Sequence, residues 1–133
     1  MKVRLGRRYR FEAAHRLVAS SLSDEENWRI YGKCSRPGGH GHNYEVDVCL
    51  EGEIDPVTGL LVRRDELDAI VREKLVDRCD HRNLNDLIDE VTTGENLARI
   101  FFDWLDPALR PLATLRRVRV YETARNVFDA RSE

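Results

Sequence analysis

The chain has 133 residues, 41% of them hydrophobic and 35% charged, and its formal net charge is -2 at pH 7. These values fit a single domain, residues 1–133, and exclude the large basic excess typical of nucleic-acid-binding proteins. No apolar stretch approaches the roughly 18 residues that a membrane helix needs, and the charged N-terminus is unlike a secretory signal, so we expect a soluble, cytoplasmic protein.

Residues 2–17 alternate between apolar and charged side chains, which is the period of a half-buried β-strand. His15 has the parity of the apolar residues, so its side chain is predicted to face the core. Arg7 interrupts the pattern, and the adjacent Gly6 is expected to mark a β-bulge. The apolar positions are Val3, Leu5, Tyr9, Phe11, Ala13 and Leu17.

The polar segment 18–39 follows. Ser23 and Glu26 form a capping-box pattern, which predicts a short helix that ends near Tyr31. Glycine and proline residues then predict a loop, and this loop contains Cys34.

Residues 40–54 alternate again, and His40 and His42 share the parity of the apolar residues Tyr44, Val46, Val48 and Leu50. The stretch 55–59 is typical of a hairpin loop. The apolar residues 60–62 are therefore expected to begin a partner strand.

Two amphipathic helices are predicted next, because apolar residues recur at three- and four-residue spacing. The first begins near Asp65, and the second begins near Thr92, which forms a capping-box pattern with Glu95. Pro107 and Pro111 are expected to end the second helix. The apolar stripes are Leu67, Ile70, Val71 and Leu75 in the first helix, and Leu97, Ile100, Phe101, Trp104 and Leu105 in the second.

A last alternating segment places Glu122 on the same side as Val118 and Val120. A carboxylate is costly to bury without a donor, and two N–H groups on the edge of a heterocycle would satisfy it. The alternative is a strand-end residue in solvent. Strands at both ends of the chain, with helices between them, predict an α+β fold with an antiparallel sheet.

His40 and His42 lie two residues apart on a predicted strand, so both imidazoles point to one side. His15 has the same inward parity on the first strand. Three neutral imidazoles are a ligand set typical of catalytic zinc, which keeps a fourth position open. The alternative is that these histidines are ordinary polar residues at strand ends.

The three cysteines, Cys34, Cys49 and Cys79, are too few and too far apart for a disulfide framework or a four-sulfur zinc site. Cys34 precedes His40 across a flexible loop, and three roles are open to it. The first is a fourth zinc ligand that closes a structural site, and the second is a thiolate that acts as base or nucleophile beside the cation. The third is a thiol without a role in the site.

Asp80 and His81 are adjacent in a predicted loop. The histidine could take a proton from a thiol while the aspartate orients the ring. The alternative is an ordinary loop after a helix, where such residues are common.

Four blocks of sequence occur in order: FEAAHRL at 11–17, Cys34 followed by five residues and HGHNY at 40–44, DHRNL at 80–84, and YET at 121–123. Together they resemble the 6-pyruvoyl-tetrahydropterin synthase family, over about residues 3–125. The five-residue spacing is similar to the animal-type, pyruvoyl-forming enzymes. FEAAHRL is similar to the related 6-carboxy-tetrahydropterin synthase of the queuosine pathway as well.

The resemblance implies a tunnelling fold, with a four-stranded antiparallel sheet and two helices on one of its faces. It also implies assembly, in which three subunits close a twelve-stranded barrel and two barrels stack into a homohexamer.

For the site, the resemblance implies Zn²⁺ on His15, His40 and His42, and Cys34 as general base. Asp80 and His81 would complete a relay, within the subunit or from a neighbouring one. Glu122 would anchor a pterin ring. Thr93 and Glu95 match a stretch near the pterin pocket, although Gly94 replaces a threonine often found there.

The implied reaction is the conversion of 7,8-dihydroneopterin triphosphate to 6-pyruvoyl-tetrahydropterin with release of triphosphate, by a zinc-dependent lyase without a redox cofactor. The alternatives are the 6-carboxy product from the same substrate, a structural zinc module with Cys34 as fourth ligand, and a pterin-binding scaffold without activity.

Overall fold

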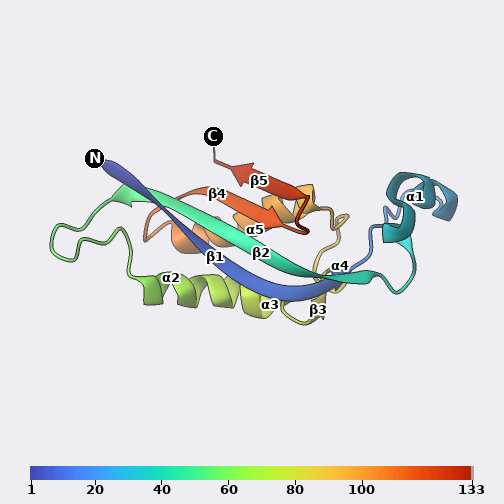
Figure 1. Cartoon of the computed structure of the whole chain (residues 1–133), viewed down its shortest axis with the longest axis horizontal. Helices are drawn as coiled ribbons and strands as arrows, with labels where there is room; N and C mark the ends of the chain where they lie inside the picture. The colour runs from blue at the N-terminus through green and yellow to red at the C-terminus, as the bar shows by residue number, and fades with distance from the viewer. Residues whose placement is uncertain (133) are drawn as a thin grey trace.

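The computed structural model describes residues 1–132. Its centre is a long antiparallel ribbon of two 14-residue strands, β1 (Lys2–His15) and β2 (His40–Glu53), which pair along their whole length. Strand β4 (Thr114–Tyr121) pairs with the other edge of β2, and β5 (Val127–Arg131) pairs with β4. A two-residue strand, β3 (Arg82–Asn83), adds to β1 in parallel. The order in the sheet is therefore β3-β1-β2-β4-β5 (Figure 1).

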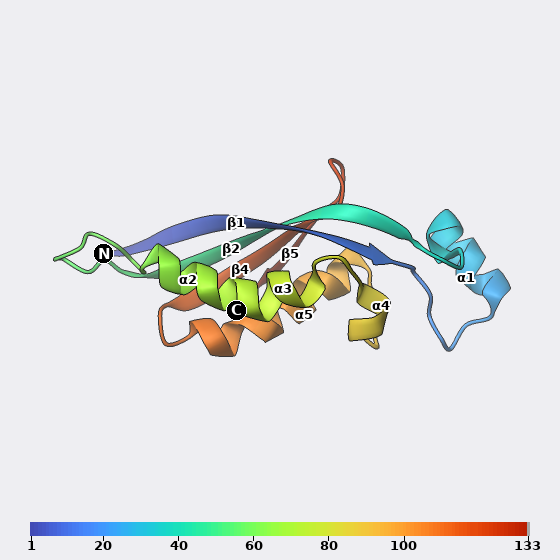
Figure 2. The same cartoon turned by 90° about the horizontal axis from the view of Figure 1, so that it is seen from below.

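Two helical segments lie together on one face of this sheet, as Figure 2 shows with the sheet seen edge-on. One continuous helical segment is made of α2 (Arg64–Val71), a π-helical turn (Arg72–Val76) and α3 (Asp77–Cys79), and beside it lies α5 (Gly94–Leu109). The core fills the space between the helices and the sheet. The chain therefore has the α+β arrangement that the sequence pattern predicts, with these helices on one face, as the family resemblance implies.

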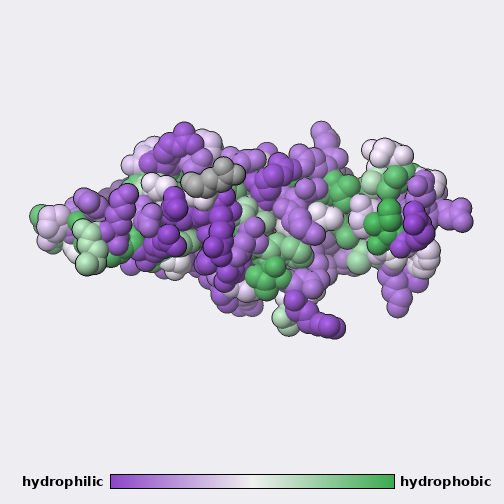
Figure 3. Space-filling view, turned by 90° about the horizontal axis from the view of Figure 1, so that it is seen from above, coloured by the Kyte–Doolittle hydropathy of each residue, from purple (hydrophilic) through white to green (hydrophobic). Residues whose placement is uncertain are grey.

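Two short helices lie outside this layer. Helix α1 (Asp24–Tyr31) extends from the far end of the ribbon, and α4 (Leu84–Leu87) follows β3 (Figure 1). The predicted capping box of α1 is confirmed, because the Ser23 side chain accepts a hydrogen bond from the Glu26 amide and Glu26 reaches back to Ser23. Much of the surface seen in Figure 3 is hydrophilic, with hydrophobic side chains at a few places that include the end carrying α1.

The expectation of a four-stranded, purely antiparallel sheet is wrong, because the sheet has five strands and one parallel pair. Residues 60–62 do not form a strand; instead Val62 packs into the core just before α2 begins. The fourth antiparallel strand is β5, where Phe128 and Ala130 pack against the core. The parallel strand β3 makes the sheet mixed.

The β-bulge predicted at Gly6 is also wrong. The register of β1 with β2 is continuous, and the irregularity lies between β2 and β4, at Cys49 and Leu50. Arg7 keeps its inward parity because Asp68 of α2 receives its guanidinium in a forked ion pair, with N···O distances of 2.7 and 2.8 Å. A charge in the apolar pattern here reflects a partner on the helix, not a break in the strand.

The start and end of α5 differ from the prediction as well. The N-cap is Thr93, whose hydroxyl accepts a hydrogen bond from the Asn96 amide, and not Thr92. The helix continues through Pro107 to Leu109. A proline in the last turn of a helix costs little when the carbonyl one turn earlier is free to turn away.

Candidate metal centre and active site

Three histidines meet where β1 ends and β2 begins. His15 and His40 are paired across the ribbon, and His42 lies two residues further along β2 on the same face. The ring centroids are 4.8 Å apart for His15 and His40, 5.1 Å for His15 and His42, and 4.7 Å for His40 and His42. One nitrogen from each ring lies within 4.8 Å of the other two, so the three rings can share one metal ion.

The chain reaches this arrangement through a close approach of backbone at Gly39. This residue has a φ of 67°, and a Cβ there would overlap the carbonyl oxygen of His15. Only glycine accommodates both conditions without strain. Gly39 therefore lets β2 start directly beside the end of β1, which brings His40 next to His15.

His15 is held in a defined orientation inside the protein. Its side chain is 1% exposed, and its Nδ1 donates a hydrogen bond to the carbonyl oxygen of Thr92, at 2.9 Å. This contact requires the proton on Nδ1 and leaves the Nε2 lone pair available to a metal. Burial, together with the neighbouring His40, lowers the pKa of His15 to about 4, so the ring is neutral at pH 7.

His42 provides the test of whether a metal fits. Its Nε2 is buried and has no hydrogen-bond partner among residues 1–132. Burial and the neighbouring His40 also lower the pKa of His42, which favours the neutral form that binds metals. A buried ring nitrogen without a partner is uncommon, and a cation at the centre of the three rings would satisfy it. The three imidazoles therefore fit a metal ion, and the donor set matches that of catalytic zinc.

Glu122 lies at the edge of this cluster. It follows β4 directly, its side chain is 14% exposed, and its Oε2 is 3.9 Å from Nε2 of His15. Burial raises the pKa of Glu122, and the nearby carboxylate of Glu95 raises it further. The structure thus places a largely buried carboxylate, rather than a solvent-exposed strand end, beside the three histidines.

The start of α5 borders the same region. The carbonyl of Thr92 holds His15, Thr93 caps the helix, and Glu95 lies close enough to Glu122 to affect its pKa. Thr93 and Glu95 are thus near the histidine cluster, while their contact with a substrate stays a prediction.

Cys34 lies in a 3₁₀ turn, Gly32–Ser35, and is partly buried. Its carbonyl accepts a hydrogen bond from the Leu17 amide, at 2.8 Å, so the turn is joined to the chain just after β1. Among the described residues, the potential metal ligands that cluster are the three histidines alone. A set of three ligands is typical of catalytic zinc sites, so the cluster gives no support to a closed structural site with Cys34 as ligand.

Asp80 and His81 do lie together, but on the outward side of β1. Nδ1 of His81 is 3.0 Å from Asp80 Oδ2, and its Nε2 is 3.5 Å from the outward-facing Glu12. Asp80 also accepts a hydrogen bond from the Glu12 amide, and this contact lowers the pKa of Asp80. The His81 side chain is 73% exposed.

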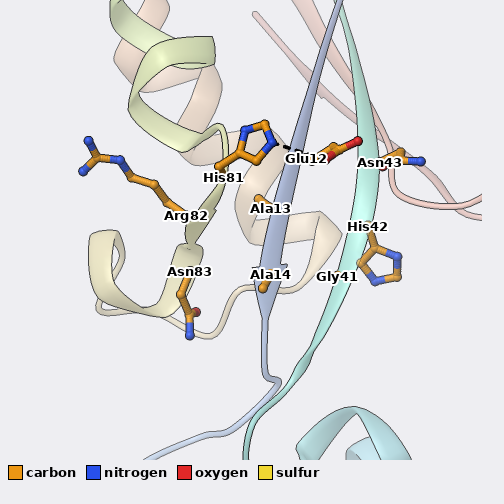
Figure 4. A pocket seen from close by; sticks show the side chains of 9 residues that line it. All are labelled: Glu12, Ala13, Ala14, Gly41, His42, Asn43, His81, Arg82 and Asn83. Atoms are coloured by element: carbon orange, nitrogen blue, oxygen red, sulfur yellow. Dashed lines mark ion pairs between the residues drawn. The ribbon is translucent and has the colours of Figure 1, made fainter.

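A cavity of about 460 Å³ adjoins this pair, and its lining comes from three segments: residues 12–14 of β1, residues 41–43 of β2, which include His42, and residues 81–83. Figure 4 shows His81 joined to Glu12 on one side of β1, while His42 points away on the far side of β2. The chain therefore pairs Asp80 with His81, and His81 shares the lining of this cavity with His42 but is not part of the three-histidine ligand group.

The comparisons with known proteins decide the family. The family model described as 6-pyruvoyl tetrahydropterin synthase matches residues 4–133. This chain belongs to that family. It is 41% identical to human 6-pyruvoyl tetrahydrobiopterin synthase, over 99% of this chain and 93% of that protein. The same enzyme of Dictyostelium discoideum is 40% identical, over 97% and 96% of the two chains.

A solved member of the 6-pyruvoyl tetrahydropterin synthase family has the same fold. The structure of the Caenorhabditis elegans enzyme aligns with a TM-score of 0.93 and 36% sequence identity, over 100% of this chain and 97% of that chain. The resemblance recognised in the four sequence blocks is thus confirmed. Within residues 1–132, no helix is long and apolar enough to cross a membrane.

Several contacts next to the candidate site were not predicted from the sequence. Asn85 of α4 accepts a hydrogen bond from the Arg16 amide, at 2.7 Å, and donates one to the Arg16 carbonyl, at 2.9 Å. The Arg16 guanidinium donates to the carbonyl of Ser35, at 2.6 Å. These contacts join the end of β1 to α4 and to the turn of Cys34. Like the Thr92 contact, they link distant parts of the chain, and no local pattern signals them.

Proposed function

We propose that this chain is a zinc-dependent lyase of the cytoplasm that converts 7,8-dihydroneopterin triphosphate to 6-pyruvoyl-tetrahydropterin and releases triphosphate. The family makes it an enzyme, a lyase of the 6-pyruvoyl tetrahydropterin synthase type. The observation that carries the finer proposal is the three-histidine cluster, with an unpartnered buried nitrogen on His42, beside the largely buried carboxylate of Glu122.

His15, His40 and His42 would hold the metal. When bound, Zn²⁺ supplies positive charge that stabilises an enolate-like oxygen while carbon-bound protons are removed from the substrate side chain. The protein contributes the ring orientation, because Thr92 fixes the tautomer of His15 and the pairing of the two strands fixes His40 and His42.

Glu122 would accept two hydrogen bonds from the amino-pyrimidine edge of the pterin. A forked pair of N–H donors stabilises an ionised carboxylate, and here it would offset the burial that raises the pKa of Glu122. Glu95 and Thr93, at the start of α5, would border the ring. This contact would place the substrate side chain toward the histidines, 3.9 Å from Glu122 at their nearest atoms.

Cys34 would act as the general base that takes a proton from the substrate side chain; His81 would then accept that proton from the thiol, while Asp80 orients the His81 ring. Because His81 pairs with outward-facing Glu12, we propose that it serves the metal centre of a neighbouring subunit. Two features support assembly: the outer edges of β5 and of residues 2–11 in β1 have no partner strand among the described residues. Open edges of this kind suit a closed barrel and a homohexamer.

The test is a product assay on purified protein whose metal content has been measured. Incubation with 7,8-dihydroneopterin triphosphate should give triphosphate and a pterin with the mass of the 6-pyruvoyl product. A 6-carboxy product would replace the proposal by the alternative reaction of the family. Bound pterin without turnover would indicate a scaffold instead of an enzyme.

A further inference from the structure

A second polar cavity lies on the open face of the sheet, the face without helices, far from the histidines. It encloses about 140 Å³, and its lining comes from four strands and the residue after β5: Arg4, Cys49, Arg116, Arg117, Arg131 and Ser132. The irregular register between β2 and β4 at Cys49 shapes it, because this bulge inserts Arg116 before Arg117, which pairs with Cys49. Bulges commonly redirect side chains in this way.

The lining of this cavity carries a large excess of positive charge. Four of its six residues are arginines, and none is acidic. Glu51 pairs with two of them, at 3.1 Å from Arg4 and 3.5 Å from Arg116, and Asp129 lies 3.3 Å from Arg131. These carboxylates are not part of the lining and offset part of its charge, whereas Arg117 has no ion pair among residues 1–132. An anion in the cavity would therefore be attracted most directly by Arg117.

Two donors in the cavity also lack partners. Nε of Arg117 and Oγ of Ser132 are buried, and neither has a hydrogen-bond partner among residues 1–132. An unpaired buried donor is costly, and a guanidinium N–H is costlier than a neutral one. Both atoms belong to the lining of the same cavity, so a single acceptor could satisfy them together.

We propose that this cavity binds a phosphate-type oxyanion, either inorganic phosphate or the terminal group of a polyphosphate. Guanidinium groups match the geometry of phosphate oxygens, and the volume suits one tetrahedral group. The site is separate from the metal centre. Cys49 is seven residues along β2 from His42, about 23 Å at the usual rise per residue, and it faces the opposite side of the sheet.

Calorimetric titration of the full-length, metal-loaded protein with inorganic phosphate and with triphosphate, at fixed ionic strength, tests this proposal. Saturable binding is expected for at least one of the two anions. Arg117→Gln should weaken it about tenfold or more, because a charge-assisted contact is lost. The matched control is Arg10→Gln, which removes one charge from the same face outside the cavity and should change the affinity by no more than about twofold.

Two further variants locate the anion. Ser132→Ala removes the other unpartnered donor at the end of the chain, where it leaves the sheet intact, and should also weaken binding. Arg16→Gln removes a charge near the candidate active site and should leave phosphate binding in place. The proposal is overturned if no anion binds, if Arg10→Gln and Arg117→Gln weaken binding equally, or if Arg16→Gln alone abolishes it. None of these outcomes bears on the lyase activity, which the product assay measures.

Discussion

The two faces of the β1–β2 ribbon carry different chemistry. On the helix-covered face, three histidines converge, and burial lowers the pKa of His15 and of His42, which favours the neutral form that binds a cation. On the open face, charges are paired in a network in which Arg8 contacts Asp47 at 2.7 Å and Glu45 at 3.1 Å, and Tyr121 donates to Asp47. Because side chains alternate along a strand, alternate residues of the same two strands form these two environments.

The two faces are therefore suited to different ions: the imidazoles of the helix-covered face to a cation, and the guanidinium groups of the open face to an anion. Neutral nitrogen donors gain by metal binding because no proton has to be displaced at pH 7. Fixed guanidinium groups gain by anion binding because their charge is permanent. The same contrast holds for two of the histidines. His42 belongs to the metal cluster, whereas His81 pairs with the outward-facing Glu12.

The largest effect is expected from removing a histidine of the inner face. His42→Ala should abolish stoichiometric zinc binding and with it turnover, because two imidazoles and water hold zinc much more weakly than three imidazoles. His81→Ala is the matched control, and it should keep one zinc per chain while turnover falls about 100-fold or more. Metal analysis of both variants checks this, and zinc retained by His42→Ala would contradict the assignment of the centre.

Cys34→Ala distinguishes a base from a ligand. We expect one zinc per chain to remain, because the described metal cluster contains no sulfur, and turnover to fall about 100-fold or more. Metal content and product formation are measured on the same preparation. Loss of zinc would favour the structural zinc module, and unchanged product formation would leave Cys34 without a catalytic role.

The convergence of the histidines was predictable from sequence, whereas their surroundings were not. Parity alone put His15, His40 and His42 on one face, because the side-chain period of a strand is fixed. Thr92, which orients His15, and Asn85, which joins α4 to the end of β1, act across more than 60 residues. Such contacts depend on the packing of α4 and α5 and have no local signature.

Which short segments form strands was harder to predict, because a short apolar run can be either a strand or a buried part of a loop. Residues 60–62 are apolar enough for a strand, yet they join the loop after β2 to α2, so the predicted hairpin does not form, and Val62 is buried there. The alternation of Val127–Arg131 is visible in the sequence, but the segment is short and ends in charges. The pairing of β3 with β1 covers two residues and lies next to a backbone hydrogen bond from the His81 amide to the Glu12 carbonyl, and so short a strand has no pattern of its own.

Glu122→Gln should weaken binding of a pterin by about 2 kcal/mol, because the amide offers one acceptor where the carboxylate offers two charged ones. Titration with neopterin, followed by its fluorescence, measures the effect. Glu95→Gln is the control on the neighbouring carboxylate and should have a smaller effect, since Glu95 is exposed. Equal affinity for wild type and Glu122→Gln would remove Glu122 from the pterin site.

The smallest effect concerns the free energy of unfolding. It involves Arg7, the one charged residue of the β1–β2 ribbon whose side chain faces the helices, and its partner Asp68. Its forked contact, with a hydrogen bond from Tyr9, lowers the pKa of Asp68 to about 2 from an ordinary value of 3.8. A lowered carboxyl pKa stabilises the fold above the unfolded value, and this stabilisation is lost as the pH falls through the folded value. Asp68 should therefore add stability at neutral pH that disappears between about pH 4 and pH 2.

Urea unfolding of metal-free protein from pH 2 to pH 7 measures this contribution as the difference between wild type and Asp68→Asn. The variant should be less stable by about 1–2 kcal/mol at pH 7, and the difference should shrink below pH 4 as Asp68 is protonated in the wild type. Asp65→Asn is the control on the same helix, and it should change stability less because its ion pair with Arg63 is exposed. A difference that does not depend on pH would mean that Asp68 stabilises the fold through packing and not through its charge.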